Sequence, residues 1–364
     1  MLKKTDAEQS IVYRNQDTFF SYCGWSSVCV DENGVLYAAA SCFRMAHVCP
    51  FGKTAMFKSI DKGKTWSLPM VVNDTYMDDR DAGITYLGDG RLLVTWFTHP
   101  AEVYKNNYSR WIKDSCGGAS GIMELYDQLG DNIAFEEQSK GGSYLRISRD
   151  YGTTFGKTIK LTINTPHGPS LCRDGSLIYL GKEMYSRGAE NPNVIAAYRS
   201  TDGGESWHRL GQLNTPAGTG WNNFHEPHVI ELKNGRLLGV IRAQGGEVAH
   251  GFTMYQSFSD DGGQSWSEMK PLGVSGSPPH LMLHSSGAVV LSFGRREEPF
   301  GERALVSYDE GETWTDEYII ADAKNGDLGY PASVELPDGS IVTVYYQQYG
   351  DDRTTSILSS HWKM

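Results

Sequence analysis

Short apolar runs recur in pairs along the chain, and each pair flanks a small polar residue followed by glycine. The six dipeptides are Asn33-Gly34, Asp89-Gly90, Asp174-Gly175, Asn234-Gly235, Ser286-Gly287 and Asp338-Gly339. The run after each dipeptide is rich in branched and aromatic side chains: VLYAAA, RLLVTWF, SLIYLG, RLLGVIR, AVVLSF and SIVTVYY. An Asx-Gly pair between two apolar runs is the strongest short-range signal for a β-hairpin. The pattern therefore predicts six hairpins.

A second repeat, Ser-x-Asp-x-Gly-x-x-Trp/Phe, follows an apolar run in five places. Its copies are Ser59–Trp66, Ser148–Phe155, Ser200–Trp207, Ser259–Trp266 and Ser307–Trp314. The aspartate can accept hydrogen bonds from backbone N–H groups of its own turn, and the glycine can take a positive φ. The aromatic ring can pack back over the loop. Nothing in this Asp box is chemically reactive, so it indicates a fold and not an activity.

The two repeats alternate in phase, which gives units of about 50 to 60 residues with four strands each. Six such units predict an all-β fold, a six-bladed β-propeller, formed by one domain over residues 1–364. A sixth Asp box is missing near the C-terminus, where the chain ends in the strand-like run TTSILSSHW. We expect the early run Ser10–Tyr13 to pair with that strand and close the ring.

Composition agrees with a turn-dense β protein, because the chain has 41 Gly, 20 Tyr and 9 Trp residues. A net charge of −11 argues against nucleic acid and anionic membranes as partners. No run reaches the length of a transmembrane helix. The start, MLKKTDAEQS, lacks the apolar region of a secretory signal, so we expect a cytoplasmic protein, or a secreted one if a signal has been removed.

The six cysteines, Cys23, Cys29, Cys42, Cys49, Cys116 and Cys172, contain no CxxC pair and no zinc-ligand spacing. Buried free thiols are the expected state, with a disulfide as the less favoured alternative. No metal and no cofactor is predicted from these residues.

The second unit carries one long insertion, about Pro100 to Gly142, between its second and third strands. Part of it, Gly121–Tyr126, has the composition of a helix. The insertion leaves the second strand at the same end as the arginine that closes the strand of the first unit. We therefore expect it to overhang one face of the propeller, as a lid or as a subunit contact.

In a propeller the innermost strands begin beside the ends of the second strands, so both open on the same face. Every unit contributes polar or charged residues at these positions. They are Arg44, His47, Asp78, Asp79, Arg80, His99, His167, His225, Glu226, His228, Arg242, His280, Arg296, Asp327, Tyr330 and Tyr345. Convergent Arg, His and carboxylate groups around a concave mouth predict a small-molecule site. The arginines indicate an anionic ligand, since a guanidinium matches the geometry of a carboxylate.

The Asp boxes, with the stretches NNFHEPHVIELKNGRLLGVIR and DLGYPASVELPDGSIVTVYY, resemble the sialidase (neuraminidase) superfamily of six-bladed propellers over essentially the whole chain. The resemblance implies a tyrosine nucleophile at the last inner strand, where Tyr330 stands, and an activating glutamate, where Glu226 stands. It implies an arginine triad that binds a carboxylate. Arg242 takes one place in it, and Arg296 or Arg303 another.

A tyrosine nucleophile suits an anionic sugar, because a carboxylate in its place would repel the substrate and a neutral phenol does not. Glu226 within hydrogen-bond reach can take the phenol proton as the bond to the anomeric carbon forms. The result is a covalent glycosyl-enzyme intermediate and retention of configuration. The alternative is that Tyr330 packs in the inner strand and Glu226 pairs with a cation.

Two departures from the family pattern affect the expected site. The segment that carries the family's first triad arginine corresponds to Tyr22–Trp25, which contains no arginine, so Arg44 or Arg80 is expected to replace it. The loop that carries the acid/base aspartate corresponds to 45–56, which contains no Asp or Glu. We expect the general acid to be Asp79, His47 or Asp78; a protonated imidazole is a suitable acid near neutral pH.

His167, His228 and His280 fall near the starts of three consecutive inner strands. They are interpreted as structural hydrogen-bonding groups, as ligand-binding residues, or as the base of a uronate β-elimination; a histidine metal cluster is a further, less favoured alternative. Trp221 is the aromatic residue selected to stack on a sugar ring, whereas Trp25, Trp96 and Trp111 are expected to pack within blades.

The sequence thus predicts an exo-acting, retaining glycoside hydrolase that releases a terminal acidic sugar, sialic acid or a related one, from a glycan. A polysaccharide lyase acting on a uronic acid and a non-catalytic glycan-binding propeller are the alternatives. An unsaturated product that absorbs in the near ultraviolet distinguishes the lyase. Ligand binding without turnover distinguishes the binding protein.

Overall fold

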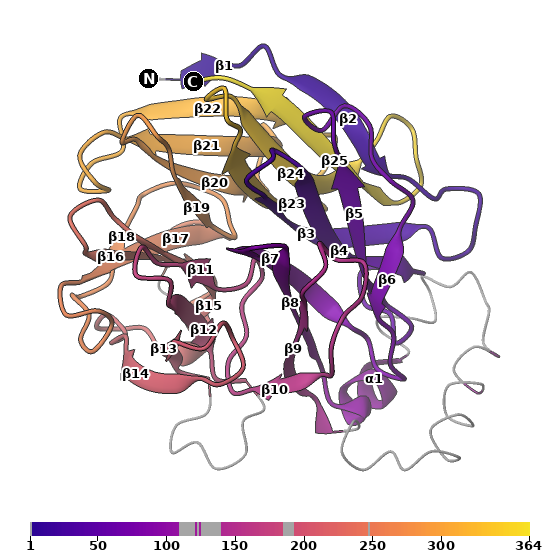
Figure 1. Cartoon of the computed structure of the whole chain (residues 1–364), viewed down its shortest axis with the longest axis horizontal. Coiled ribbons are helices and arrows are strands. Elements are labelled where there is room, and N and C mark those ends of the chain that lie inside the picture. The colour runs from indigo at the N-terminus through magenta and orange to yellow at the C-terminus, as the bar shows by residue number, and fades with distance from the viewer. Residues whose placement is uncertain (1, 109–120, 122–123, 125–139, 185–192, 247) are drawn as a thin grey trace.

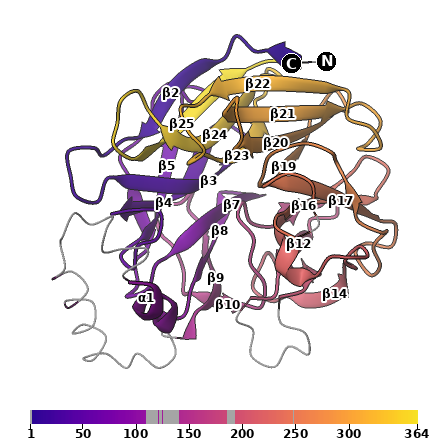
Figure 2. The same cartoon turned by 180° about the vertical axis from the view of Figure 1, so that it is seen from behind.

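The computed structural model describes residues 2–108, 121, 124, 140–184, 193–246 and 248–364 of the chain. Its strands form six separate sheets arranged around a central axis, as Figure 1 shows face-on and Figure 2 shows from behind. The prediction of an all-β, six-bladed propeller is confirmed.

The first three blades follow one another along the chain, each running from an inner to an outer strand. Blade one contains β3 (Tyr22–Val30), β4 (Leu36–Arg44), β5 (Lys53–Ser59) and β6 (Met70–Asn73). Blade two contains β7 (Arg80–Gly88), β8 (Arg91–Thr98), β9 (Gly142–Ser148) and β10 (Ile159–Leu161). Blade three contains β11 (Ser170–Leu171), β12 (Leu177–Lys182), β13 (Ile195–Ser200) and β14 (His208–Gln212).

Blade four again consists of four consecutive strands, whereas blades five and six each also contain a strand from the N-terminal segment. Blade four contains β15 (Phe224–Glu231), β16 (Leu237–Ala243), β17 (Thr253–Ser259) and β18 (Lys270–Pro271). Blade five contains β19 (His280–Leu283), β20 (Val289–Arg295), β21 (Gly301–Ser307) and β22 (Asp316–Asp322), and β1 (Leu2–Lys4) adds to it in parallel. Blade six contains β23 (Gly329–Glu335), β24 (Ile341–Gln348), β25 (Thr355–Trp362) and β2 (Glu8–Tyr13).

The ring closes as predicted, because β2 pairs antiparallel with β25, with Ser10 opposite Ser359 and Ile11 opposite Leu358. Figure 1 shows the two termini close together at the same edge of the ring. The parallel addition of β1 to blade five was not predicted from the sequence. The N-terminal segment therefore adds one strand to blade five and one to blade six.

The Asp boxes form the expected turns. In the first copy Thr65 N donates to Asp61 Oδ1 at 2.9 Å, and Ser59 Oγ accepts from Gly63 N at 2.9 Å. Gly63 has φ of 82°, and the indole of Trp66 donates to Gly63 O at 3.1 Å. The serine, aspartate and glycine contacts recur in the other four copies. The boxes therefore stabilise the hairpins between third and fourth strands.

The apolar core is divided among the interfaces between neighbouring blades. One cluster joins blades six and one, with Trp25, Phe57 and Tyr346 among its buried members. Comparable clusters join blades three and four and blades four and five. Because the apolar core lies between the blades, polar residues can line the axis of the propeller.

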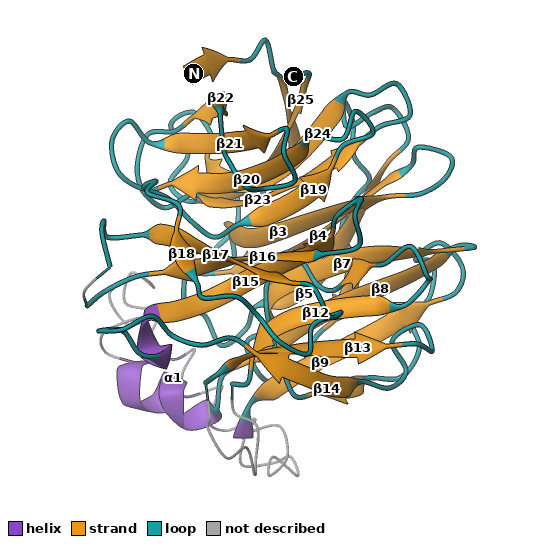
Figure 3. Ribbon diagram, turned by 90° about the vertical axis from the view of Figure 1, so that its left-hand side faces the viewer, coloured by secondary structure: helices purple, strands orange, loops and turns teal. Residues whose placement is uncertain are grey.

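Five cysteines, Cys23, Cys29, Cys42, Cys49 and Cys172, are buried and free, as expected, and Cys116 lies outside the described residues. The helix α1 (Ala101–Tyr108) follows β8 and stands beside the strand ends at one edge of the ring (Figure 3). No helix in the described part of the chain combines the length and apolar character needed to cross a bilayer.

Candidate active site

A cavity of about 270 Å³ opens at the axis, where inner strands begin and second strands end. All six blades, with their connecting segments, contribute to its wall, which agrees with the geometric argument from the sequence. The lining residues are Trp25, His47, Arg80, Asp81, Phe97, His99, Asn164, Lys182, Met184, His225, Glu226, Arg242, Gln244, Arg296 and Tyr330.

Four of these residues occupy the same special backbone position in their blades. Trp25, Asp81, Glu226 and Tyr330 have positive φ values of 52°, 52°, 44° and 51°. Each lies at a register shift between the inner strand and its neighbour, which marks a β-bulge. A bulge redirects a side chain, and a left-handed non-glycine residue costs about 1–2 kcal/mol. The strained positions therefore coincide with the side chains that are directed into the cavity.

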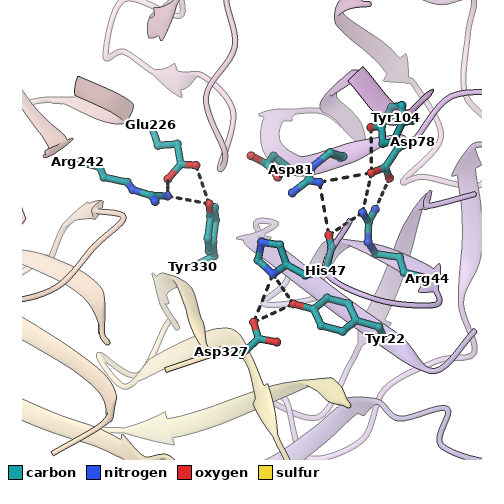
Figure 4. Close-up of polar contacts among 11 residues, drawn as sticks. Tyr22, Arg44, His47, Asp78, Asp81, Tyr104, Glu226, Arg242, Asp327 and Tyr330 are labelled. Carbon is teal, nitrogen blue, oxygen red and sulfur yellow. Dashed lines mark hydrogen bonds and ion pairs between the residues drawn. The ribbon is translucent and has the colours of Figure 1, made fainter. Parts of the chain in front are cut away.

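Tyr330 and Glu226 form the hydrogen bond that the sequence predicts (Figure 4). Tyr330 Oη donates to Glu226 Oε1 at 2.7 Å, across the axis between blades six and four. Arg242 Nη1 donates to Glu226 Oε2 at 2.5 Å and lies 3.3 Å from Tyr330 Oη. Gln244 Oε1 accepts from Arg242 Nε at 3.0 Å and holds the other side of the guanidinium.

The protonation states of this pair suit a proton transfer from tyrosine to glutamate. Burial raises the pKa of Tyr330 well above its usual value, and the nearby charges of Glu226 and Asp81 raise it further. The pKa of Glu226 stays below its ordinary value although burial opposes this, because Arg242 and the Tyr330 hydroxyl stabilise the carboxylate. At neutral pH the phenol is therefore protonated and the glutamate is ionised.

Three arginines line the cavity: Arg80, Arg242 and Arg296. The ring of Phe252 lies 5.0 Å from the guanidinium carbon of Arg242 and 5.3 Å from that of Arg296, so it supports both. Arg296 also lies over the ring of Tyr330, at 5.6 Å. Its Nε and Nη2 have no hydrogen-bond partner among the described residues. The cavity thus presents cationic donors to an anionic ligand.

Arg80, and not Arg44, brings the third guanidinium to the cavity. Arg44 is fully buried and pairs with Asp78, donating from Nη2 to Oδ2 at 2.7 Å. The same carboxylate accepts from Tyr104 Oη of α1 at 3.1 Å and lies 3.5 Å from Arg80 Nη1. Both guanidiniums lie over the ring of Trp25, Arg80 at 4.4 Å and Arg44 at 4.6 Å. Arg44 and Asp78 therefore hold Arg80 in place from behind.

The carboxylate that reaches the cavity from this segment is Asp81, which sequence reasoning did not select. Its side chain is 4 % exposed, and Oδ1 lies 4.0 Å from Arg80 Nε. Burial raises the pKa of Asp81 to about 7, against the opposing effect of Arg80. A carboxyl group that is half protonated near neutral pH has the property required of a general acid.

Asp79 does not line the cavity. Its carboxylate accepts from the backbone N of Thr75 at 2.9 Å and from Thr75 Oγ1 at 3.1 Å, which closes the loop before β7. Successive side chains of an extended segment alternate in direction, and the bulge at Asp81 then turns that residue inward. Asp81, and not Asp79, therefore presents its carboxyl group to the cavity from this segment.

His47 lines the cavity as expected. Its Nδ1 lies 2.8 Å from Tyr22 Oη and 3.4 Å from Asp327 Oδ1, and Tyr22 donates to Asp327 at 2.9 Å (Figure 4). The pKa of His47 is lowered by burial, with Asp327 acting in the opposite direction. Asp327 therefore sits behind His47 and orients it.

Two other predicted residues lie outside the cavity. Arg303 follows the bulged start of β21 and donates to the backbone oxygens of Ala321 and Pro299, at 3.1 and 3.2 Å. It caps the end of a strand pair, and its side chain is not among the residues that line the cavity. Tyr345 is buried and its hydroxyl contacts Gln9 and Ser360, both at 2.8 Å.

The three histidines come together at the axis below the cavity without lining it. The ring centroids of His228 and His280 are 4.5 Å apart, and those of His167 and His280 are 5.0 Å apart. His228 Nδ1 accepts from Leu281 N at 3.0 Å, and His280 Nδ1 accepts from Ser333 N at 3.2 Å. Each of these hydrogen bonds joins the inner strands of two neighbouring blades, which belong to separate sheets. The interpretation as structural hydrogen-bonding groups fits His228 and His280.

Burial lowers the pKa of all three histidines, so they are neutral near pH 7. Their Nδ1 acceptors leave the proton on Nε2 of His228 and His280. Among the described residues, no group of three or more His, Cys, Asp or Glu side chains is arranged to hold a metal ion.

Several cavity residues carry signals that the sequence interpretation passed over. In three blades the residue at the bulge stands eight positions before the Asx-Gly turn. The pairs are Asp81 and Asp89, Glu226 and Asn234, and Tyr330 and Asp338. This constant spacing marks the bulge position in the sequence. Lys182 ends its second strand, and Arg242 stands one residue before the end of its own; the Lys182 ammonium donates to Phe224 O at 2.8 Å. Burial lowers the pKa of Lys182 to about 8.

Trp221 is not among the residues that line the cavity. It packs against the cluster between blades two and three and against the cluster between blades three and four, and its carbonyl accepts from Lys182 at 3.0 Å. The described start of the insertion, α1, contacts the site through Tyr104. Trp111 lies outside the described residues, and so does most of the Gly121–Tyr126 stretch predicted as helical.

Comparisons with known proteins agree with this architecture. A family model described as a BNR repeat-like domain matches residues 118–343. A protein of unknown function from Dyadobacter fermentans superposes with a TM-score of 0.75 at 20 % identity, covering 98 % of both chains. The NanB sialidase from Streptococcus pneumoniae gives 0.69 at 13 % identity, covering 98 % of this chain and 70 % of that one.

The intramolecular trans-sialidase from Ruminococcus gnavus gives a TM-score of 0.67 at 16 % identity, covering 98 % of this chain and 97 % of that one. A search of curated protein sequences found no match. At these identities the structural neighbours establish the shared fold.

Proposed function

This chain belongs to the BNR repeat-like domain family and is a propeller of the sialidase superfamily, and we propose that it is an exo-acting, retaining glycoside hydrolase that releases a terminal acidic sugar from a glycan. The observation that carries the proposal is the 2.7 Å hydrogen bond from Tyr330 Oη to Glu226 Oε1 inside a cavity lined by three arginines.

Substrate binding follows from the charges of the wall. Arg80, Arg242 and Arg296 face a carboxylate on the sugar, and Tyr330 stays a neutral phenol that does not repel it. The cavity, of about 270 Å³, accommodates one terminal sugar unit, near the lower end of the ordinary range of about 300–1,000 Å³ for small-ligand sites. A cavity of this size at the propeller axis supports exo action on a terminal sugar unit.

The first chemical step forms the glycosyl-enzyme bond. Tyr330 Oη attacks the anomeric carbon while Glu226 takes the phenol proton. The bond from the anomeric carbon to the leaving oxygen breaks, and Asp81 donates its proton to that oxygen. In the second step, Asp81 takes a proton from a water molecule that attacks the anomeric carbon. The bond from that carbon to Tyr330 Oη breaks, and Glu226 returns its proton to the phenolate. Two displacements retain the configuration.

The decisive experiment measures turnover of an aryl sialoside and of a panel of aryl uronides by the wild type and by Tyr330→Phe. The substitution removes one hydroxyl, so we expect turnover to be lost while the melting temperature is nearly unchanged. Tyr345→Phe is the matched control, because that buried hydroxyl lies outside the cavity. Near-normal activity of Tyr330→Phe would refute the nucleophile.

The identity of the substrate follows from the same panel. Release from the sialoside indicates a sialidase with Arg80 in the rebuilt clamp, and release from a uronide alone indicates that the changes in blade one have moved the specificity. An ultraviolet-absorbing unsaturated product identifies a lyase instead. Binding of the acidic sugar with no turnover of any glycan identifies a binding protein.

A further inference from the structure

A second cavity, of about 310 Å³, lies between the outer parts of blades one and two and shares no lining residue with the first. Strand β8 separates the two. Phe97 and the following His99 face the axial cavity, whereas Trp96 and Thr98 face the second one. Alternate residues of a strand point to opposite faces, so a single strand forms a wall of both cavities.

An aromatic pair forms one side of this second cavity. Trp96 and Tyr144 are cross-strand partners in β8 and β9, with ring centroids 5.8 Å apart and an interplanar angle of 24°. Tyr76, from the loop before β7, is 41 % exposed and lies at the rim. Aromatic faces of this kind pack against the C–H faces of sugar rings and provide large apolar contact with few rotatable bonds.

Buried polar groups without partners line the same cavity. The indole N–H of Trp96 and the hydroxyl of Thr98 have no hydrogen-bond partner among the described residues. The two residues are 1 % and 2 % exposed. A buried donor left unsatisfied destabilises a fold unless a bound molecule or water accepts its hydrogen bond. Two such groups beside one cavity indicate a polar occupant.

The charges of this cavity are balanced, in contrast to the arginine-rich axial one. Its lining includes one cation, Arg146, and one anion, Asp74. Arg146 donates to Val72 O at 2.9 Å and to Thr158 Oγ1 at 3.1 Å, and Asp74 pairs with Lys53. Among the described residues, the wall therefore carries no excess charge, and it combines aromatic faces with uncharged donors.

We propose that this second cavity is a binding site for a neutral pyranose sugar, which packs on the rings of Tyr144 and Tyr76 and accepts hydrogen bonds from Trp96 and Thr98. Sugar hydroxyls both donate and accept, and the ring presents C–H groups to an aromatic face. The site is separate from the catalytic groups, so it holds a glycan without cleaving it. Its position across β8 from the axial cavity places the bound sugar beside the reacting one.

The test uses ligand-observed NMR with the full chain and three probes: methyl β-D-galactopyranoside, methyl β-D-glucopyranoside and methyl α-D-mannopyranoside. We expect saturation transfer to at least one probe. Thr98→Val removes a donor and keeps the shape, and Trp96→Phe removes a donor and keeps an aromatic ring of smaller size. We expect the double variant to weaken that probe at least tenfold. Tyr76→Ala, at the exposed rim, weakens it without disturbing the core.

Arg242→Ala, which alters only the axial cavity, is the matched control and should bind the neutral probe as the wild type does. Failure of the wild type to bind any of the three probes overturns the proposal, as does binding that survives the Tyr76→Ala and double substitutions. Loss of the probe in Arg242→Ala assigns it to the axial cavity and also overturns the proposal. None of these readings depends on turnover.

Discussion

Tyr330 and Glu226 meet across the propeller axis at 2.7 Å, each at a bulge with left-handed backbone in its own inner strand. The two residues are separated by blade five, so their contact depends on the arrangement of three consecutive blades around the axis. The equivalent bulge in blade two presents Asp81, and the one in blade one presents Trp25. Repetition of one strained backbone feature thus assembles the groups proposed as nucleophile, base and acid.

Glu226→Gln tests the base. The amide can still accept from Tyr330 Oη but cannot take its proton, so we expect kcat to fall by about 10²–10⁴-fold, as for loss of a general base. Steady-state kinetics with the aryl substrate identified for the wild type measures this. Glu231→Gln, on the same strand but paired with Arg173 outside the cavity, is the control and should retain activity. An unchanged kcat in Glu226→Gln would exclude it as base.

Asp81→Asn tests the acid through the pH profile. Because the pKa of Asp81 is raised to about 7, its acid form is lost as the pH rises through 7, and activity should fall there. The base must be ionised, so activity should also fall below the lowered pKa of Glu226. We expect a bell-shaped profile whose alkaline limb disappears in Asp81→Asn.

The leaving group provides a second reading of the same variant. A nitrophenol leaves without protonation, whereas a sugar alcohol needs a proton. Asp81→Asn should therefore lose far more activity on an oligosaccharide than on a nitrophenyl glycoside. Asn tolerates left-handed backbone, so the bulge is kept. His47→Gln and Asp79→Asn are the comparison variants. If the leaving-group effect is seen in His47→Gln and not in Asp81→Asn, His47 and not Asp81 is the general acid.

Arg296→Ala tests the clamp. Its guanidinium has two nitrogens without a partner among the described residues, so it is available to a ligand carboxylate. We expect binding of the acidic sugar to weaken by more than ~1.5 kcal/mol, the size of a hydrogen bond to a charged group. Calorimetry with the free sugar measures it, and Arg295→Ala is the neighbouring control outside the cavity. Equal affinities in wild type and Arg296→Ala would remove it from the clamp.

Asp78→Asn tests the support behind Arg80. The carboxylate and Arg44 are both fully buried, and removing one charge of such a pair costs about 3–5 kcal/mol. Urea unfolding should show this loss. Asp74→Asn breaks the half-exposed pair with Lys53 and should cost less than about 1 kcal/mol. A similar, small loss in both variants would show that the Asp78 network does not hold the site.

The Asp boxes predict sensitivity to acid. Hydrogen bonds from Thr65 lower the pKa of Asp61 to about 2, and Asp150 and Asp261 have the same value for the same kind of reason. A lowered carboxyl pKa stabilises the fold above the unfolded value, near 4, and this contribution is lost as the pH falls toward 2. Urea unfolding at pH 6 to 2 should show the decline, and Asp261→Asn should be less stable at pH 6 with a shallower decline. Parallel curves for the two proteins would contradict this.

The sequence by itself determined the elements and their order. Asx-Gly turns, β-branched runs and Asp boxes act within a few residues of each other, so hairpins, blade number and even the closing strand Ser10–Tyr13 follow from local patterns. The resemblance to sialidases selected Tyr330, Glu226 and Arg242, which the structure brings together.

Only the tertiary structure decided which polar residues at the propeller mouth face the axis. Asp79 and Asp81 are two positions apart, yet one closes a loop and the other lines the cavity, because a bulge breaks the strand alternation between them. Arg80 replaces Arg44 because Asp78 and Tyr104 hold Arg44 behind the wall. The direction of a side chain near a bulge depends on how its strand pairs with the next strand and packs against the next blade. The spacing of residues along the sequence does not give this information.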